Sequence, residues 1–188
     1  MAVDDDRLER ARRVRLLAMD VDGTLTDGGI VIGPDGELAK RFSVRDGFGL
    51  TLLARAGIEL AIVTGRQSAI VGQRARELGI RHVQQGVKDK AAALSALCGS
   101  LGIGLDESAF IGDDWPDLAV MAACGFAAAP ADAVDEVRAA AHWVAMAPAG
   151  HGAVRELAML LIDARGLRSA LLAAFAGTDG APGSGGSR

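Results

Sequence analysis

The chain has 188 residues, half of them hydrophobic, and carries a formal net charge of -4 at pH 7. This length favours one compact domain, and the acidic balance with scattered basic residues argues against a nucleic-acid-binding surface. Its two cysteines, Cys98 and Cys124, are too few for a disulfide framework or a zinc site. We therefore expect a cytoplasmic protein with reduced thiols, and no apolar run reaches the ~18 residues that predict a membrane contact.

The two ends of the chain differ in composition from its middle. Residues 1–15 include the basic stretch RLERARRVR and predict a solvated lead-in. Residues 177–188, GTDGAPGSGGSR, are rich in Gly and Ser, a composition typical of a disordered tail. We expect one folded domain over residues 16–176.

Short apolar runs alternate with helical patterns along that domain. Strand candidates fall at 14–21, 58–65, 82–86, 109–114, 125–130 and 142–146. Between and after them, apolar residues recur at helical spacing, as in Val71, Ala75 and Leu78, in Leu94, Leu97, Cys98 and Leu101, and in Val154, Leu157, Ala158 and Leu161. This alternation predicts an α/β fold, a doubly wound, Rossmann-like parallel sheet with helices on both faces.

One segment interrupts the alternation. Residues 28–47 contain the turn GPDG between two strand-like arms and predict a β-hairpin over about 28–46. The arms carry apolar residues that a monomer would expose, so we expect hairpins of neighbouring subunits to pair.

Polar residues follow three of the predicted strands, in the stretches DVDGT, TGR and GDD. Ligands of open parallel sheets bind beyond the carboxyl ends of the strands, where these side chains would converge with Lys90. The converging residues are Asp20, Asp22, Thr64, Arg66, Asp113 and Asp114. Several carboxylates close together require a cation, and an all-oxygen ligand set indicates Mg²⁺.

Carboxylates, Mg²⁺ and a lysine around one crevice suit phosphoryl transfer. A carboxylate can attack phosphorus while the cations neutralise the phosphate. There is no Walker loop, which argues against ATP as the phosphate donor. Water is a plausible final acceptor of the phosphate. Alternate strand residues share one side, so Asp20 and Asp22 can act together, one on phosphorus and the other on the leaving oxygen.

These motifs, in this order, resemble those of the haloacid dehalogenase-like phosphatase superfamily. The resemblance implies that Asp20 is the nucleophile, that Asp22 is the general acid and base, and that Thr64 and Lys90 bind phosphate. It also implies a Mg²⁺ site formed by Asp20, the main-chain carbonyl of Asp22, and Asp113. Asp114 and Asp117 would orient these groups, although DDWPD is equally a good helix N-cap sequence.

The spacing between motifs leaves no room for a cap domain. More closely, DVDGTLTDG, FSVRDGFG, AIVTGRQS and GAVRE resemble the capless subfamily that hydrolyses 3-deoxy-D-manno-octulosonate 8-phosphate for lipopolysaccharide synthesis. That resemblance implies a homotetramer in which neighbouring subunits complete each site around a small phosphorylated sugar acid. It implies substrate contacts from Thr24, Gly65, Arg66, Arg45, Asp46 and His151. His151 stands where the subfamily often has a cationic residue.

Alternatives remain open from the sequence. A nonulosonate 9-phosphate of the sialic-acid type presents the same two charged ends to the site. A phosphatase of macromolecules would also tolerate an open site, and a non-catalytic oligomerisation module would need only the hairpin. Arg45 and Asp46 would equally suit a salt-linked helix cap, and His151 would suit a surface loop.

Overall fold

The structure is a computed structural model that describes residues 2–177. Apart from Gly177, the predicted tail lies outside the described residues. None of the helices in the described part is long and apolar enough to cross a membrane.

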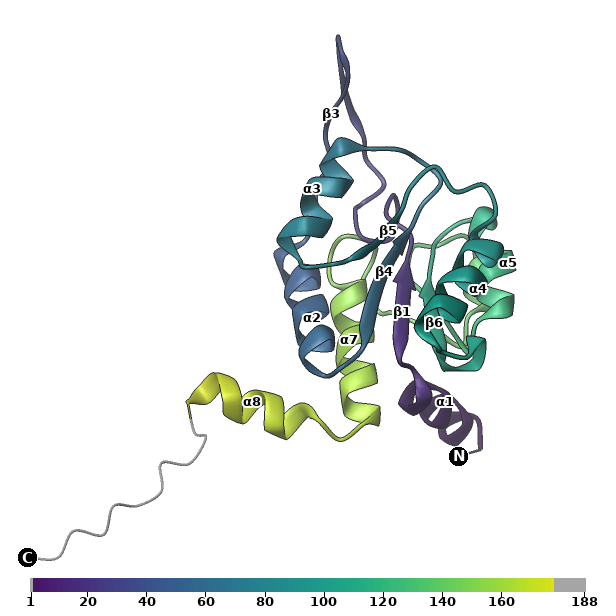
Figure 1. Cartoon of the computed structure of the whole chain (residues 1–188), viewed down its shortest axis with the longest axis vertical. Coiled ribbons are helices and arrows are strands. Elements are labelled where there is room, and N and C mark those ends of the chain that lie inside the picture. The colour runs from purple at the N-terminus through teal and green to yellow at the C-terminus, as the bar shows by residue number, and fades with distance from the viewer. Residues whose placement is uncertain (1, 178–188) are drawn as a thin grey trace, which may run out of the picture.

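Six parallel strands form the central sheet, in the order β5-β4-β1-β6-β7-β8. All six coincide with predicted strands, and their bounds are β1 Leu16–Met19, β4 Glu59–Val63, β5 His82–Gln84, β6 Ser108–Ile111, β7 Phe126–Ala129 and β8 Trp143–Val144. After β1 the chain builds outward through β4 and β5, and it then returns to the other side of β1 with β6 (Figure 1). This reversal makes the fold doubly wound and places its switch point between β1 and β6.

Both faces of the sheet are covered because the strands are apolar on both sides. Leu17 and Met19 of β1 belong to one buried cluster, and Leu16 and Ala18 belong to the other. The first cluster packs against α1 Ala2–Arg13, α2 Val44–Arg55, α3 Ala69–Glu77 and α7 Ala153–Ala164. The second packs against α4 Lys90–Leu101, α5 Leu118–Ala123 and α6 Asp135–Ala140. Two short 3-10 turns, η1 Leu105–Glu107 and η2 Trp115–Asp117, and the helix α8 Arg168–Ala176 complete the described chain.

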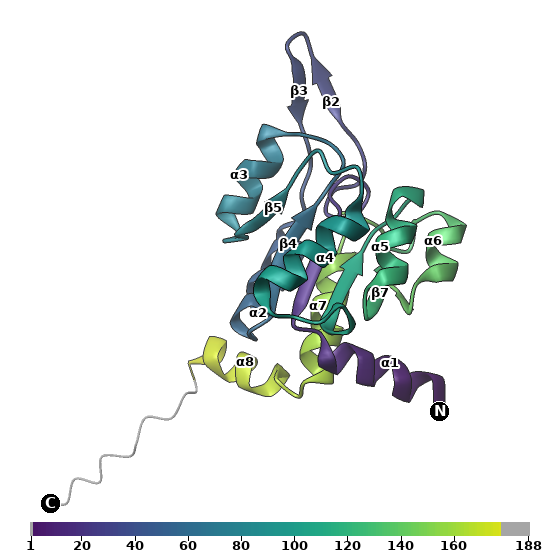
Figure 2. The ribbon, with the colours of Figure 1, turned by 45° about the vertical axis from the view of Figure 1, so that its right-hand side comes forward.

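The N-terminal segment differs from the expected solvated lead-in. It forms α1, which contacts α7 (Figure 2). Ala11 and Val14 are fully buried, and the Arg12 Nε donates a hydrogen bond to the Ala164 carbonyl at 3.0 Å. The surrounding basic residues obscured these apolar positions, which extend the core to residues that precede the predicted domain start at residue 16.

The predicted hairpin is present and projects from the carboxyl edge of the sheet (Figure 2). It comprises β2 Val31–Gly33 and β3 Gly36–Ala39, which pair antiparallel. Its strands are shorter than expected, because Ser43 caps α2 and Phe42 packs against the core. The hairpin exposes apolar side chains at Val31, Ile32 and Leu38. No cap domain interrupts residues 2–177, as the spacing of the motifs predicts.

Candidate active site

The candidate site lies at the switch point of the sheet. Asp20 follows β1 directly, and its main-chain N–H donates to the Ile111 carbonyl at 3.1 Å. This bond ties the end of β1 to the end of β6, two residues before Asp113. The carboxyl ends of these two strands therefore bring together acidic residues that are 93 positions apart in the sequence.

A tight turn carries the chain from Asp20 to Thr26. The Val21 carbonyl accepts hydrogen bonds from the N–H groups of Thr24, Leu25 and Thr26. Gly23 has a φ of 85°, and a Cβ there would lie 2.1 Å from Asp113 Oδ2, so both conformation and space require glycine. Because β1 ends at Met19, Asp22 lies in this turn, which corrects the expectation that strand alternation aligns it with Asp20.

Three carboxylates form an acidic cluster at this edge: Asp20, Asp113 and Asp117 each offer an oxygen within 4.8 Å of the others. Thr24 Oγ1 donates to Asp113 Oδ1 at 3.0 Å, and the Asp113 N–H donates to Asp117 Oδ2 at 3.0 Å. Burial, reinforced by the charge of Asp20, raises the pKa of Asp113 to about 7. Burial also raises the pKa of Asp20, although Lys90 opposes that shift.

Lys90 is the cation inside this cluster. Its Nζ lies 3.0 Å from Asp20 Oδ1 and 2.6 Å from Asp117 Oδ1. As the first residue of α4 it opposes the helix dipole, and the side chain is buried. Burial alone would lower the pKa of Lys90, but the charges of Asp20 and Asp117 outweigh it and the net shift is upward.

The acidic cluster suits a divalent metal ion. Three carboxylates and one ammonium have a net formal charge of about -2 when all are ionised. Asp20 Oδ1 is buried, and its ion pair with Lys90 at 3.0 Å does not have the geometry of a hydrogen bond. An all-oxygen site with this deficit matches Mg²⁺ better than a soft metal. Asp117 differs from the other two, since its oxygens already bind Lys90 and the Asp113 N–H.

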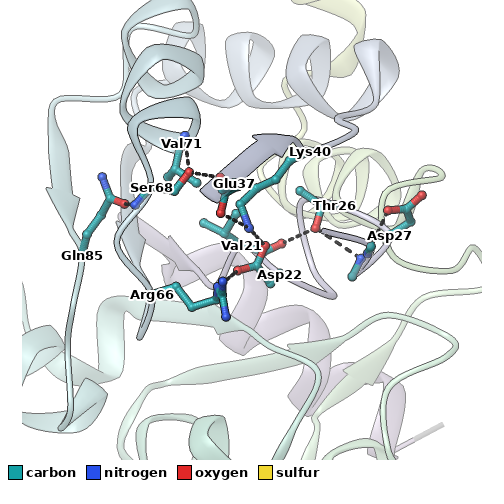
Figure 3. A network of polar contacts seen from close by, with 12 residues as sticks. Val21, Asp22, Thr26, Asp27, Glu37, Lys40, Arg66, Ser68, Val71 and Gln85 are labelled. Carbon is teal, nitrogen blue, oxygen red and sulfur yellow. Dashed lines mark hydrogen bonds and ion pairs between the residues drawn. The ribbon is translucent and has the colours of Figure 1, made fainter. Parts of the chain in front are cut away.

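Asp22 belongs to a second group, which we call the hairpin network: Asp22, Glu37, Lys40 and Arg66. Lys40 reaches from the hairpin and donates to Asp22 Oδ1, while Arg66 Nε lies 3.6 Å from Asp22 Oδ2 (Figure 3). Glu37 Oε2 lies 3.4 Å from Lys40 Nζ, and Glu37 Oε1 accepts a hydrogen bond from Ser68 Oγ. The carboxylate of Asp22 is thus outside the acidic cluster. Its predicted main-chain metal contact stays a prediction.

Sequence reasoning missed Glu37 and Lys40. It treated the hairpin as an apolar surface for another subunit, because Val31, Ile32 and Leu38 dominate its pattern. Glu37 and Lys40 are three residues apart, so strand alternation, which places every second side chain on one face, does not group them, and the local pattern carries no signal that both approach Asp22.

Members of both groups line one pocket of about 180 Å³: Asp20 and Lys90 from the acidic cluster, and Asp22 and Arg66 from the hairpin network. Its lining contains all four predicted catalytic residues, Asp20, Asp22, Thr64 and Lys90, and two of the predicted substrate contacts, Gly65 and Arg66. Thr64 is buried and held by its main chain between the Gln84 carbonyl and the Val87 N–H. The Arg66 side chain is 55% exposed. The structure therefore places the predicted phosphate-binding residues beside the predicted nucleophile.

Two predicted substrate contacts have structural roles instead. The carboxylate of Asp46 is buried and accepts hydrogen bonds from the main-chain N–H groups of Gly152, at 3.1 Å, and Arg155, at 2.8 Å. It therefore caps the N-terminus of α7, without a salt link to Arg45. Thr24 is fully buried and its hydroxyl orients Asp113. Neither side chain is available to a ligand.

Three further predicted residues lie outside the pocket. Arg45 is exposed and borders a separate hollow with Phe48 and Arg155. His151 is exposed, with its Nδ1 2.8 Å from the Ala149 carbonyl oxygen. The carboxylate of Asp114 accepts from the Trp115 N–H and caps η2. Within one chain, these residues do not meet Asp20.

Comparison with known proteins gives consistent relatives. A family model described as haloacid dehalogenase-like hydrolase matches residues 83–157. The 3-deoxy-D-manno-octulosonate 8-phosphate phosphatase of Yersinia pestis is 43% identical over 163 residues, which cover 87% of each chain. The protein of the same name from Escherichia coli strain K12 is 42% identical over 164 residues, again 87% of each chain.

Solved structures agree with these relatives. The crystal structure of 3-deoxy-D-manno-octulosonate 8-phosphate phosphatase from Moraxella catarrhalis, in complex with magnesium, phosphate and KDO, has a TM-score of 0.88 and 43% identity. The match covers 91% of this chain and 98% of the Moraxella catarrhalis chain. The cobalt-bound deoxy-D-mannose-octulosonate 8-phosphate phosphatase from Haemophilus influenzae has a TM-score of 0.82 and 38% identity. That match covers 84% of this chain and 92% of the Haemophilus influenzae chain.

Proposed function

The chain belongs to the haloacid dehalogenase-like hydrolases, and we propose that it is a Mg²⁺-dependent phosphatase of 3-deoxy-D-manno-octulosonate 8-phosphate. The observation that carries the proposal is the cluster of Asp20, Asp113 and Lys90 at the switch point, in a chain 42–43% identical to relatives of that name. Those relatives favour the octulosonate over a nonulosonate. The free sugar acid would serve lipopolysaccharide synthesis.

In the proposed reaction, an oxygen of Asp20 attacks phosphorus. The bond from Asp20 to phosphorus forms, the bond from phosphorus to the sugar oxygen breaks, and Asp22 protonates the departing alkoxide. Water then attacks the aspartyl phosphate while Asp22 takes its proton. The bond between Asp20 and phosphorus breaks, which releases phosphate and restores both carboxyl groups.

The surrounding residues have distinct proposed roles. Lys90 neutralises charge on the phosphate, and Thr64 and Gly65 border the position it would occupy. Asp20 and Asp113 would hold Mg²⁺, which supplies charge neutralisation and orientation of the phosphate when bound. Asp117 fixes Lys90 and the loop after β6. The exposed guanidinium of Arg66 is suited to the carboxylate of the sugar acid.

The pocket supports a further proposal, that subunits share sites. About 180 Å³ is small beside the roughly 300–1,000 Å³ of pockets that enclose a small ligand. Val31, Ile32 and Leu38 expose apolar surface on the hairpin, which contacts the pocket residue Asp22 through Lys40. We propose a homo-oligomer, a tetramer by resemblance, in which Arg45 and His151 reach a neighbour's site. We also propose a cytoplasmic location, which the two buried free thiols at Cys98 and Cys124 suit.

The test is phosphate release with Mg²⁺ from three substrates: 3-deoxy-D-manno-octulosonate 8-phosphate, a nonulosonate 9-phosphate and an aryl phosphate. We expect a kcat/KM of at least ~10⁴ M⁻¹s⁻¹ for the octulosonate and far lower values for the others. A higher value for the nonulosonate would overturn the substrate. No release from any of the three would overturn the reaction class.

A further inference from the structure

The hairpin network contains a buried cation that the proposed reaction does not yet use. The side chain of Lys40 is 0% exposed, although it originates on a hairpin that projects into solvent. A buried ammonium is costly unless carboxylates compensate it, and here Asp22 and Glu37 both do so. This costly buried charge therefore lies directly beside Asp22, a residue that lines the pocket.

The two oxygens of Asp22 have different surroundings. Oδ1 accepts a hydrogen bond from buried Lys40, whereas Oδ2 lies 3.6 Å from Arg66, whose side chain is 55% exposed. An exposed guanidinium can move away at small cost when a ligand arrives, but a buried lysine held by two carboxylates cannot. Oδ1 is therefore anchored and Oδ2 is the oxygen free to exchange partners (Figure 3).

Lys40 is itself fixed by a second contact. Glu37 Oε2 lies 3.4 Å from Lys40 Nζ, and the other oxygen of Glu37 accepts a hydrogen bond from Ser68 Oγ. Ser68 is the N-cap of α3, which packs on the core. The chain of contacts from Ser68 through Glu37 and Lys40 to Asp22 ties the hairpin to the rigid part of the domain.

We propose that Lys40 is a positioning residue for Asp22: it anchors Oδ1 so that Oδ2 faces the pocket and exchanges the proton with the leaving alkoxide and then with water. Glu37 acts through Lys40. This inference rests on the proposed function of Asp22. It makes Glu37 and Lys40 of the hairpin part of each chain's own site, in addition to the exposed apolar side chains that we assign to neighbouring subunits.

The test compares two esters in the full-length variant Lys40→Met. An alkyl phosphate needs a proton for its leaving group, whereas p-nitrophenyl phosphate does not, so a misplaced acid affects them differently. Since a positioned acid or base contributes roughly 10²–10⁴-fold, we expect kcat/KM for the octulosonate ester to fall about 100-fold and that for the aryl ester to change less than about 3-fold. Hydrolysis of the aspartyl phosphate also slows, so the aryl ester gives a burst of about one nitrophenolate per site.

Two further variants make the result specific. Arg41→Met, beside Lys40 on the hairpin but 73% exposed and paired with Asp27, keeps wild-type kinetics with both esters. Glu37→Gln gives a smaller loss that is again greater for the octulosonate ester, about 5-fold, because the lysine loses one of its two anchors.

The outcomes separate this inference from the proposed function. Equal losses on both esters without a burst, or unchanged activity of Lys40→Met on the octulosonate ester, would overturn the positioning role. A wild-type enzyme that hydrolyses the aryl ester but not the octulosonate ester would overturn the proposed substrate. In that case the same comparison with any alkyl phosphate that it does hydrolyse decides on Lys40.

Discussion

Two groups of charged residues border the same pocket, and they differ in how their charges balance. The acidic cluster has three carboxylates and one ammonium, whereas the hairpin network pairs Asp22 and Glu37 with Lys40 and Arg66. Burial, reinforced by the negative charge of Asp20, raises the pKa of Asp113 to about 7. The comparison teaches that the metal ion belongs in the acidic cluster. The hairpin network already has a formal charge of zero and suits the orientation of the Asp22 carboxylate.

The substitution Asp20→Asn should have the largest effect, and it changes the acidic cluster without changing the hairpin network. Loss of the nucleophile should lower phosphate release more than about 1,000-fold. Neutralising one of three buried carboxylates should leave the melting temperature in EDTA equal or higher. Steady-state kinetics and thermal unfolding measure both effects. Residual activity above ~1% would argue against covalent catalysis at Asp20.

The charge deficit also predicts how Mg²⁺ binding depends on pH. With the pKa of Asp113 near 7, the ion must displace a proton below that pH, so its affinity should fall up to about tenfold per pH unit. Because this pKa is raised from about 3.8, the metal-free fold holds the proton more tightly than the unfolded chain. Its stability should therefore decline as pH rises from about 4 to about 7.

Calorimetric titrations with Mg²⁺ at pH 5.5 to 8, beside melting temperatures in EDTA, check both signs. Asp113→Asn provides the control, because it has no proton to displace at this position. Affinity that stays constant over this range would contradict the account of the acidic cluster.

The exposed apolar side chains of the hairpin offer a change that spares both charged groups. Val31→Asp with Leu38→Asp places charges on exposed apolar side chains and should dissociate the oligomer. Activity should fall about 5-fold, because the small pocket loses its cover. Light scattering coupled to size-exclusion chromatography and kinetics measure this, with exposed Met146→Asp as the matched control. A fully active monomer would disprove shared sites.

The smallest expected effect comes from Thr24→Val. It removes the hydrogen bond of 3.0 Å to Asp113 while nearly preserving shape, so Mg²⁺ affinity should fall about 3-fold. Thr51→Val, which removes a hydroxyl bonded to the Gly47 carbonyl in α2, should leave that affinity unchanged. An equal effect of both variants would show that Thr24 acts through the fold and not through Asp113.

The sequence was sufficient to predict the sheet and the positions of the residues that follow its strands. Six apolar runs became strands, and parallel strands necessarily bring their carboxyl ends to one edge, so Asp20, Thr64 and Asp113 meet there. Ala11 and Val14 show where this reasoning failed, because two apolar residues among arginines carry too little periodic signal to reveal a packed helix.

Side-chain partners were harder to predict than positions. Asp46 lies in a motif that resembles a substrate-binding segment, yet its carboxylate caps a helix more than 100 residues later in the chain. The sequence neighbours of Lys40 are exposed, so its burial becomes evident only from its contact with Asp22 in the folded chain. Such contacts depend on how loops cross at the sheet edge, which local patterns do not encode.

The most direct test of the difference between the two groups is Mg²⁺ binding by calorimetry to the wild type, Asp113→Asn and Glu37→Gln. The account predicts that Asp113→Asn weakens binding at least about 10-fold and that Glu37→Gln leaves it unchanged, because the hairpin network needs no cation. Equal weakening by both variants, or no binding to the wild type, would contradict it.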